Sequence, residues 1–222
     1  MLNFKAFTFN AYQENTYVIF NDQKECAIID PGCYSKTEQE QLLSYIQENE
    51  LIPRYLLNTH GHIDHMLGNR YVKDTFDIPF LTHELVINEL EATKAYGAMF
   101  GFSPAPSPPP DKLVDEGDVI ALGDEEIKVI FTPGHSAGHI SFYHEASAQL
   151  FSGDVLFQGS IGRTDLPGGD YPTLMRTIFQ KLIPLGSEVI VYPGHGPSTT
   201  IEQEIASNPF VRQHWLEFFP EA

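Results

Sequence analysis

Thr59-His60-Gly61-His62-Ile63-Asp64-His65 is the stretch that decides how this chain is interpreted, because it places three histidines and a carboxylate within six consecutive residues. Imidazole and carboxylate groups are the ligands that divalent zinc, iron, manganese and cobalt accept. A polar surface loop is the alternative interpretation. Core packing explains the crowding poorly, since each buried imidazole needs a hydrogen-bond partner. The stretch therefore predicts a metal site.

Three later motifs also place a histidine or an aspartate directly after an apolar run. They are Phe131-Thr132-Pro133-Gly134-His135, Phe151-Ser152-Gly153-Asp154 and Tyr192-Pro193-Gly194-His195. In an α/β architecture, strand ends and their loops gather at one edge, where sites are built. We therefore expect seven side chains to converge: His60, His62, Asp64, His65, His135, Asp154 and His195. Seven ligands are more than one tetrahedral ion needs and suit two ions that share one ligand.

The spacing of apolar residues predicts that strands and helices alternate in two similar halves. Expected strands of the first half cover residues 4–9, 16–20, 25–29, 55–57 and 78–81, and expected helices cover 37–48, 65–76 and 84–96. Expected strands of the second half cover residues 119–122, 127–131, 139–143, 149–151 and 188–192, with a hairpin turn at Asp124-Glu125. Its expected helices cover residues 171–182 and 199 to the end. Two such halves can pack sheet on sheet with helices outside.

The segment Ser103-Pro104-Ala105-Pro106-Ser107-Pro108-Pro109-Pro110 is an exception to this alternation. Five prolines in eight residues exclude a helix or a central strand and predict a stiff, extended loop. The loop lies between the metal-like motifs, which suggests a rim or lid over the site. A plain connector is the equal alternative.

Length and charge limit the classes of protein that fit. The chain has 222 residues, of which 42% are hydrophobic, so we expect one domain over residues 1–222 with a sizeable core. The formal net charge of −17 argues against nucleic acid as a partner, because phosphate binding needs clustered Lys and Arg. No apolar window is long enough to cross a bilayer, so no membrane partner is expected.

The two cysteines predict a reducing environment. Cys26 lies in an apolar run and is expected in the core, and Cys33 follows the turn Asp30-Pro31-Gly32. Their spacing fits neither a disulfide framework nor a usual zinc pair. The opening residues Met1-Leu2-Asn3-Phe4-Lys5 do not have the pattern of a secretory signal. Together these features predict a cytoplasmic protein.

The order His-x-His-x-Asp-His, Gly-His, Gly-Asp, Gly-His resembles the signature of the metallo-β-lactamase superfamily over nearly the whole chain. The resemblance implies an α+β fold, a four-layer αβ/βα sandwich with the site along one edge. It also implies two divalent ions, zinc or alternatively iron or manganese. His60, His62 and His135 would hold the first ion, and Asp64, His65 and His195 the second. Asp154 would bridge them.

The paired Asp64 and His65 are similar to the glyoxalase II-like (hydroxyacylglutathione hydrolase-like) branch of this superfamily. The segment from Gly159 to Asp170 resembles short, single-domain members of that branch. The resemblance implies hydrolysis of a small-molecule thioester by a metal-bridging hydroxide, with Asp64 and Asp154 as catalytic carboxylates. The larger glyoxalase II enzymes bind glutathione through basic residues, whereas here Arg212 is the only basic residue in about the last forty.

Two other functions remain as alternatives. A mononuclear-iron persulfide (sulfur) dioxygenase would use His60, His135 and Asp154 and leave positions open for oxygen and persulfide. A non-enzymatic, metal-bound module is the third interpretation. The complete second set of ligands favours a dinuclear hydrolase over both.

Several polar residues outside the ligand set have two interpretations each. Asp30 either accepts a hydrogen bond from a ligand histidine, without binding the metal itself, or caps its turn. Arg163 either binds a substrate carboxylate or forms an ion pair with Asp165 or Asp170. His83, His144 and His214 have no partners at ligand spacing, so surface or packing roles are expected.

The stretch Gly134-His135-Ser136-Ala137-Gly138 matches the nucleophile-elbow pattern Gly-x-Ser-x-Gly. An elbow needs a helix after the serine, but the residues after Gly138 alternate as in a strand. We therefore interpret the match as chance. Ser136 and His139 are expected to orient ligands or to close the turn.

Overall fold

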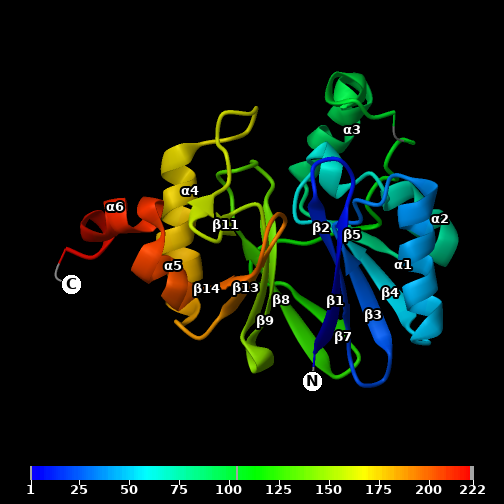
Figure 1. Ribbon diagram of the computed structural model, residues 1–222, viewed down its shortest axis with the longest axis horizontal. Coiled ribbons are helices and arrows are strands. Elements are labelled where there is room, and N and C mark those ends of the chain that lie inside the picture. The colour runs from blue at the N-terminus through cyan, green and yellow to red at the C-terminus, as the bar shows by residue number, and fades with distance from the viewer. Residues whose placement is uncertain (1, 104, 221–222) are drawn as a thin grey trace.

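The computed structural model describes residues 2–103 and 105–220, and most of its strands form two sheets that face each other (Figure 1). The first sheet has the order β1-β2-β3-β4-β5-β6, and the second has the order β14-β13-β10-β9-β8-β7. The strands of the first sheet are β1 (Asn3–Phe9), β2 (Glu14–Phe20), β3 (Glu25–Ile29), β4 (Ile52–Leu57), β5 (Phe80–Thr82) and β6 (Lys112–Leu113). Those of the second sheet are β7 (Val119–Leu122), β8 (Glu125–Phe131), β9 (Ile140–His144), β10 (Gln149–Gly153), β13 (Ile190–Pro193) and β14 (Thr199–Thr200). A separate hairpin joins β11 (Leu156–Phe157) to β12 (Ser160–Ile161).

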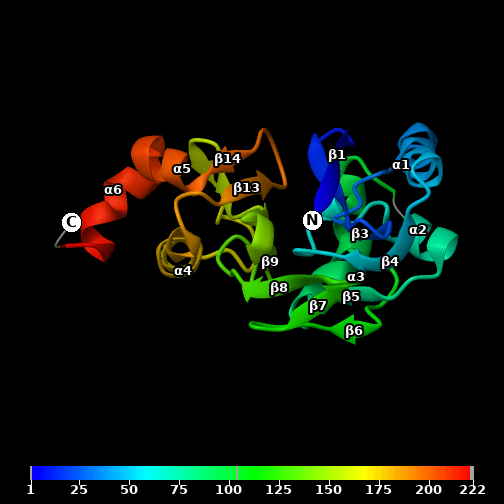
Figure 2. The same cartoon turned by 90° about the horizontal axis from the view of Figure 1, so that it is seen from below.

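The first half contributes the helices α1 (Lys36–Glu48), α2 (Asn69–Phe76) and α3 (Val86–Tyr96), and the second α4 (Tyr171–Thr177), α5 (Ile201–Ser207) and α6 (Pro209–Phe218). In Figures 1 and 2, α1 and α2 cover the outer side of the first sheet and α4 and α5 that of the second, whereas α3 lies above the edge that is uppermost in Figure 1. Short 3-10 helices cover Ile63–His65, Gly97–Phe100, Glu145–Ser147 and Ile183–Leu185, and one π-helical segment covers Ile178–Leu182. In the described part of the chain, no helix combines the length and the apolarity needed to cross a membrane.

Apolar side chains fill three separate layers. Ile29, Val129 and Phe151 belong to the layer between the two sheets. Leu42 of α1 belongs to the layer outside the first sheet, and Leu174 of α4 to the layer outside the second. Burial of these three layers is the main force that holds helices, sheets and helices in this order. The predicted α+β fold, a four-layer αβ/βα sandwich, is confirmed.

Both cysteines are free, and both lie in the layer between the first sheet and its helices. Cys26 is therefore in the core, as predicted. Burial raises the pKa of its thiol to about 12. The thiolate form is scarce at neutral pH, so neither a redox nor a nucleophilic role is expected of Cys26.

The prediction of one unbroken helix from residue 199 to the C-terminus is wrong in detail. Residues 199–200 form β14, and a break at Asn208 separates α5 from α6. Asn208 is the N-cap of α6, since its side chain accepts hydrogen bonds from the backbone N–H groups of Phe210 and Val211. Pro209 cannot donate to the preceding turn, so a new helix begins there.

Two further boundaries differ from expectation. The hairpin turn between β7 and β8 is Gly123-Asp124, and Glu125 already belongs to β8. Gly123 has φ +60°, which glycine adopts without strain, and this explains the position of the turn. The helix expected over residues 65–76 begins only at Asn69, after the 3-10 helix Ile63–His65.

The described residues of the proline-rich segment form neither helix nor strand, as predicted; Pro104 lies outside them. The segment is tied to α2. Arg70 Nε donates to the carbonyl of Pro106 (3.2 Å), and Asn69 Nδ2 donates to Ser107 Oγ (2.9 Å). These contacts favour a connector between α3 and β6. Phe102, which precedes the prolines, packs with Ile63 and Leu67 beside the histidine stretch.

Candidate metal centre

All four predicted motifs lie in loops at the ends of neighbouring strands. The histidine stretch follows β4, and His135, Asp154 and His195 follow β8, β10 and β13. These strands end at the edge that is uppermost in Figure 1, between the two sheets. The first sheet supplies His60, His62, Asp64 and His65, and the second sheet supplies the other three predicted ligands. The candidate site is therefore built from both halves.

Four of the histidines are oriented by an acceptor at Nδ1. His65 Nδ1 donates to Asp30 Oδ2 (3.1 Å), and His60 Nδ1 lies 2.9 Å from Thr59 Oγ1. His135 Nδ1 donates to the carbonyl of Arg163 (2.8 Å), and His195 Nδ1 donates to that of Tyr12 (3.1 Å). A neutral imidazole that donates from Nδ1 keeps a lone pair on Nε2. Each Nε2 is thus available as a metal ligand.

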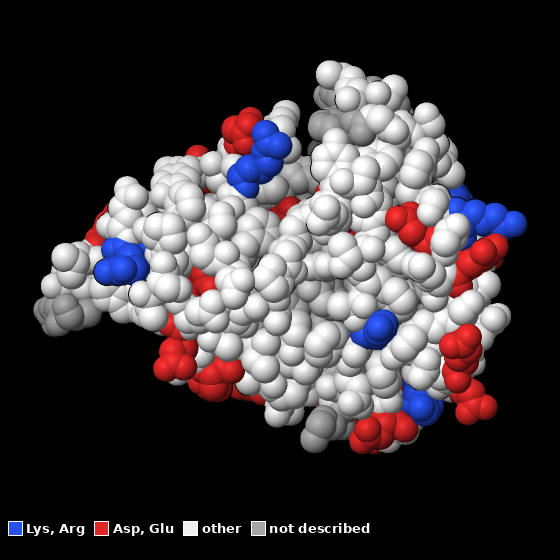
Figure 3. Space-filling model, viewed as in Figure 1, with Lys and Arg blue, Asp and Glu red and all other residues white. Residues whose placement is uncertain are grey.

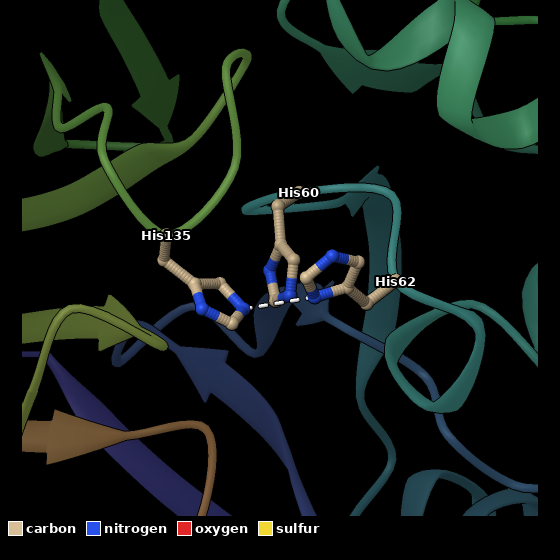
Figure 4. A group of neighbouring side chains, drawn as sticks. All are labelled: His60, His62 and His135. Atoms are coloured by element: carbon tan, nitrogen blue, oxygen red, sulfur yellow. Dashed lines mark hydrogen bonds between the residues drawn. The ribbon is translucent and has the colours of Figure 1, made fainter. Parts of the chain in front are cut away.

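The ring nitrogens that remain face one another. His62 Nδ1 lies 2.8 Å from His135 Nε2, the pair joined by a dashed line in Figure 4. His65 Nε2 lies 3.2 Å from His195 Nε2. Because the Nδ1 atoms of His65 and His195 both donate elsewhere, two neutral rings would face each other with their Nε2 lone pairs, and a positive charge between them, either a proton or a metal ion, removes that repulsion. The donor set therefore fits a bound cation.

Two buried atoms of predicted ligands lack any hydrogen-bond partner in the described part of the chain. They are His60 Nε2 and Asp154 Oδ1. A buried acceptor without a hydrogen-bond partner costs free energy, so these two atoms are expected to bind a metal ion. Three-donor groups form around each predicted ion, His60 with His62 and His135, and Asp64 with His65 and His195. Within each group the ligand atoms lie within 4.8 Å of one another.

Asp154 lies between these two groups. Its Oδ1 is 3.4 Å from His65 Nε2, and its Oδ2 is 3.5 Å from both His135 Nε2 and His195 Nε2. Burial opposes ionisation, but His65 and the other imidazoles outweigh it and lower the pKa of Asp154 well below its ordinary range. Asp154 thus has the position and charge expected of a shared ligand.

Charge in the two groups is distributed unevenly. Burial and the neighbouring imidazoles lower the pKa of His60 well below its ordinary value, so His60 is neutral. Burial also lowers the pKa of His65, but Asp154 and Asp64 outweigh it and raise that pKa well above its ordinary value. Asp64 Oδ2 lies 3.2 Å from His195 Nε2. The carboxylates thus favour positive charge on the Asp64 side of the site.

Two glycines leave room for the ligands. A Cβ atom on Gly194 would lie 2.2 Å from Asp154 Oδ1 and 2.5 Å from His65 Cε1. A Cβ atom on Gly162 would lie 1.9 Å from the carbonyl oxygen of Asp154. Any larger residue at either position would displace a predicted ligand. The Gly-His and Ile-Gly-Arg turns therefore depend on glycine for space.

Asp30 connects the first sheet to the histidine stretch. Its carboxylate accepts hydrogen bonds from Asn58 Nδ2 (3.2 Å), the backbone N–H and hydroxyl of Thr59, and His65 Nδ1. The Asp30 carboxylate thus contacts a predicted ligand and the loop after β4, and these contacts lie outside its own turn. Its contact with His65 is the arrangement typical of metal-ligating histidines.

Arg163 forms an ion pair with Asp165. Arg163 Nε donates to Asp165 Oδ1 (2.8 Å), and one terminal nitrogen donates to Oδ2 (2.7 Å). Both side chains are mostly exposed. The ion-pair alternative is thus present, with Asp165 rather than Asp170. The backbone of Arg163, and not its side chain, contacts the site through the carbonyl that accepts from His135.

The residues expected to have packing or turn roles behave accordingly. His83 stacks on Phe131, His144 contacts Glu125, and His214 contacts Glu217. Ser136 is followed by a loop and then β9, so the helix that a nucleophile elbow needs is not present there. His139 Nε2 accepts from the backbone N–H of Asp154 (3.1 Å), which makes it a support for that residue.

Glu14 is a site residue that the sequence analysis missed. It is fully buried, and its Oε1 lies 4.0 Å from His65 Nδ1 and has no hydrogen-bond partner in the described part of the chain. Burial raises the pKa of Glu14 well above its ordinary value, although His65 opposes this. The sequence offered no signal, because Glu14 is the first residue of β2 and follows a polar segment, where a glutamate is ordinarily exposed.

Comparisons with known proteins agree with this architecture. The family model described as the metallo-beta-lactamase superfamily matches residues 10–195. The hydroxyacylglutathione hydrolase GloC of Haemophilus influenzae is 39% identical over 95% of this chain and 98% of its own. The crystal structure of the BLEG-1 B3 metallo-beta-lactamase has a TM-score of 0.87 at 41% identity, covering 94% of this chain and 99% of that one.

A crystal structure of TTHA1623 in a di-iron-bound form has a TM-score of 0.84 at 36% identity, covering 93% of this chain and 99% of that one. The family match covers more than half of the chain, and the relatives are matched over nearly their whole lengths. The chain belongs to the metallo-beta-lactamase superfamily of metallo-hydrolases.

Proposed function

We propose that this protein is a hydrolase that uses two divalent metal ions to cleave a small-molecule thioester. The observation that carries the proposal is the pair of facing donor groups with Asp154 between them. His60, His62 and His135 would hold the first ion, Asp64, His65 and His195 the second, and Asp154 both. Nitrogen and oxygen donors of this kind suit zinc first, and also iron and manganese.

When bound, two such ions would lower the pKa of a water molecule toward neutrality and polarise the carbonyl that it attacks. The chain supplies the groups around that water. Burial opposes ionisation of Asp64, but His65 and His195 outweigh it and lower its pKa, so Asp64 is ionised at neutral pH. We assign to Asp64 the acceptance of the proton, and to Asp154 the alignment of both donor groups.

A thioester suits this site because its leaving group needs little help from an acid. A free thiol has a pKa of about 8.5, so the thiolate leaves without a proton donor. Aromatic side chains offer contacts for the substrate beside the second donor group. Phe157 lies 6.3 Å from His195 ring to ring, and the half-exposed ring of Tyr12 packs on Phe102 (5.5 Å).

The relatives support hydrolysis and leave the acyl group open. The name of GloC favours an acylglutathione substrate. The similarity to the BLEG-1 B3 metallo-beta-lactamase favours β-lactam hydrolysis as a second candidate, since a lactam carbonyl can meet the same attacking water. The di-iron-bound form of TTHA1623 favours iron as an alternative to zinc. A one-iron persulfide dioxygenase would leave Asp64, His65 and His195 without a use.

The distribution of charge on the surface bears on whether the protein binds nucleic acid. On the face shown in Figure 3, Lys and Arg side chains are scattered, and Asp and Glu side chains lie mostly along the lower and right-hand borders. The net charge of −17 opposes binding to nucleic acid. We propose a cytoplasmic location, because Cys26 and Cys33 are free thiols.

Elemental analysis of the purified protein, paired with a substrate panel, tests the proposal. The panel holds S-lactoylglutathione, a thioester of an uncharged thiol, a β-lactam and glutathione persulfide, the last with an oxygen electrode. We expect two metal ions per chain and release of thiol. One iron per chain with oxygen uptake on the persulfide would establish the dioxygenase instead. Metal binding without turnover of any compound would favour the non-enzymatic module.

A further inference from the structure

Glu89 of α3 connects the two loops that carry the ligands predicted for the first ion. Its Oε2 accepts a hydrogen bond from the backbone N–H of Gly61 (2.8 Å), and its Oε1 accepts one from the hydroxyl of Ser136 (2.6 Å). Gly61 separates His60 from His62, and Ser136 follows His135. One carboxylate therefore contacts both loops next to three predicted ligands.

The packing of α3 against these loops depends on glycine. A Cβ atom on Gly61 would lie 2.5 Å from Glu89 Cβ and 3.1 Å from Val86 Cγ1. A Cβ atom on Gly138 would lie 2.8 Å from the backbone nitrogen of Val86. The first turn of α3 thus lies directly against both loops, and this contact brings Glu89 within hydrogen-bond distance of each.

We propose that Glu89 is a positioning residue for the first-ion site, because it fixes the loop of His62 relative to the loop of His135. This inference rests on the two-ion centre proposed above. The two loops follow β4 and β8, which belong to different sheets. The backbone hydrogen bond from the Ile140 N–H to the Thr59 carbonyl (2.8 Å) links the sheets next to His60, but no strand pairing sets the spacing of 2.8 Å between His62 Nδ1 and His135 Nε2. A charged acceptor with two donors is a strong, directional link of the kind that can set this spacing.

The second-ion group is held by other contacts. His65 is oriented by Asp30, and His195 by the carbonyl of Tyr12. Neither contact involves α3. Loss of the Glu89 carboxylate should therefore weaken binding of the first ion and leave binding of the second unchanged. A general loss of stability would weaken binding of both.

Four single variants separate the contributions. Glu89→Ala removes both hydrogen bonds, and Ser136→Ala removes one. Glu89→Gln keeps an acceptor for Gly61 and a donor for the Ser136 oxygen, so it should restore most of the function. Glu91→Ala is the matched control, because Glu91 is an exposed glutamate on the same helix.

Zn²⁺ binding is measured by competition with a chromophoric chelator, starting from metal-free protein. Loss of an outer-shell partner typically lowers metal affinity by about 10–100-fold, which is the loss expected at one site of Glu89→Ala. The loss of zinc affinity should be smaller in Ser136→Ala. In the double variant Glu89→Ala/Ser136→Ala it should be no larger than in Glu89→Ala alone. Glu91→Ala should bind zinc as the wild type does, and Glu89→Gln should keep most of the wild-type affinity. The thermal unfolding of each metal-free variant is recorded in parallel.

Two double variants identify which ion-binding site is affected. When Glu89→Ala is added to His195→Ala, which lacks a donor for the second ion, binding of the first ion should weaken. In His62→Ala, which lacks a first-ion donor, adding Glu89→Ala should change nothing. Equal weakening in both backgrounds, or in neither, would overturn the inference, as would a wild type that binds fewer than two ions. A wild type that binds two ions but hydrolyses no thioester would contradict the proposed function alone.

Discussion

Asp30 holds Thr59 by both its backbone and its side chain: Oδ1 accepts from the Thr59 N–H (2.7 Å), and Oδ2 accepts from its hydroxyl (2.6 Å). The same hydroxyl lies 2.9 Å from His60 Nδ1, and Asp30 Oδ2 also accepts from His65. One buried carboxylate thus orients a predicted ligand of each ion. Asp30 thus acts on the predicted ligands through hydrogen bonds, directly on His65 and through Thr59 on His60.

Substitution of Asp30 should therefore weaken the binding of both metal ions. Asp30→Ala leaves the Thr59 N–H and His65 Nδ1 without acceptors, and we expect metal affinity to fall by about 10–100-fold. Asp30→Asn keeps one acceptor oxygen and should lie between wild type and Asp30→Ala. Chelator competition measures both. Unchanged affinity in Asp30→Ala would show that the contact with His65 has no role in metal binding.

Substitution of Asp154 should have the largest effect, because it lies between both donor groups. Asp154→Ala should lose metal and hydrolytic activity together, since each ion loses a ligand. Elemental analysis and a thiol-release assay measure this. His83→Ala, a buried histidine outside the site, serves as the control and should keep both ions. Retention of two ions and full turnover by Asp154→Ala would rule out the two-ion model.

Substitution of Arg163 should have little effect on binding of metal or substrate. Its guanidinium is already paired with Asp165 at the surface, and such a pair contributes about 0–1 kcal/mol to stability. The carbonyl that accepts from His135 remains in Arg163→Ala. We expect unchanged KM values for S-lactoylglutathione and for an uncharged thioester. A higher KM confined to the carboxylate-bearing substrate would instead make Arg163 a substrate-binding residue.

Glu38 should make the stability of the metal-free protein depend on pH. Burial raises the pKa of Glu38, but the backbone N–H groups of Ser35, Asn10 and Tyr34 outweigh it, so the folded-state pKa is lowered. A depressed carboxyl pKa contributes stability above the unfolded value of about 4.5, and this contribution is lost as pH falls through the folded-state pKa.

Glu38→Gln should thus lower the free energy of unfolding by about 1 kcal/mol at pH 7 and by less at pH 3 to 4. Urea denaturation at both pH values measures the difference. Glu40→Gln, on the same helix and exposed, should change little at either pH. An effect of Glu38→Gln that grew as the pH fell would contradict this assignment.

The sequence could predict the layers and the histidine stretch because both depend on local patterns. Apolar runs mark the strands, and the positions of His60, His62 and Asp64 are fixed by their spacing after β4. Short strands were missed, since residues 112–113 and 199–200 become strands only by pairing with β5 and β13 in the folded chain. Their two-residue patterns carry no periodicity.

The supporting residues of the site could not be predicted for the same reason. Glu89 is 28 residues from Gly61 and 47 from Ser136, and Glu14 is 51 residues from His65. A single buried carboxylate has no spacing rule that identifies its partners. Such contacts are set by how the two sheets pack, which only the three-dimensional structure shows.

The division of the predicted ligands between the two sheets has a thermodynamic consequence. Each ion would bind side chains from both halves of the chain, and would thus act as a cross-link between them. Binding to the native state alone adds RT ln(1 + [metal]/Kd) to the free energy of unfolding, about 4 kcal/mol at a thousandfold excess over Kd. The docking of the two halves would then be strongest where free metal is plentiful, and a metal-starved cell would hold a looser, more protease-sensitive form of the same protein.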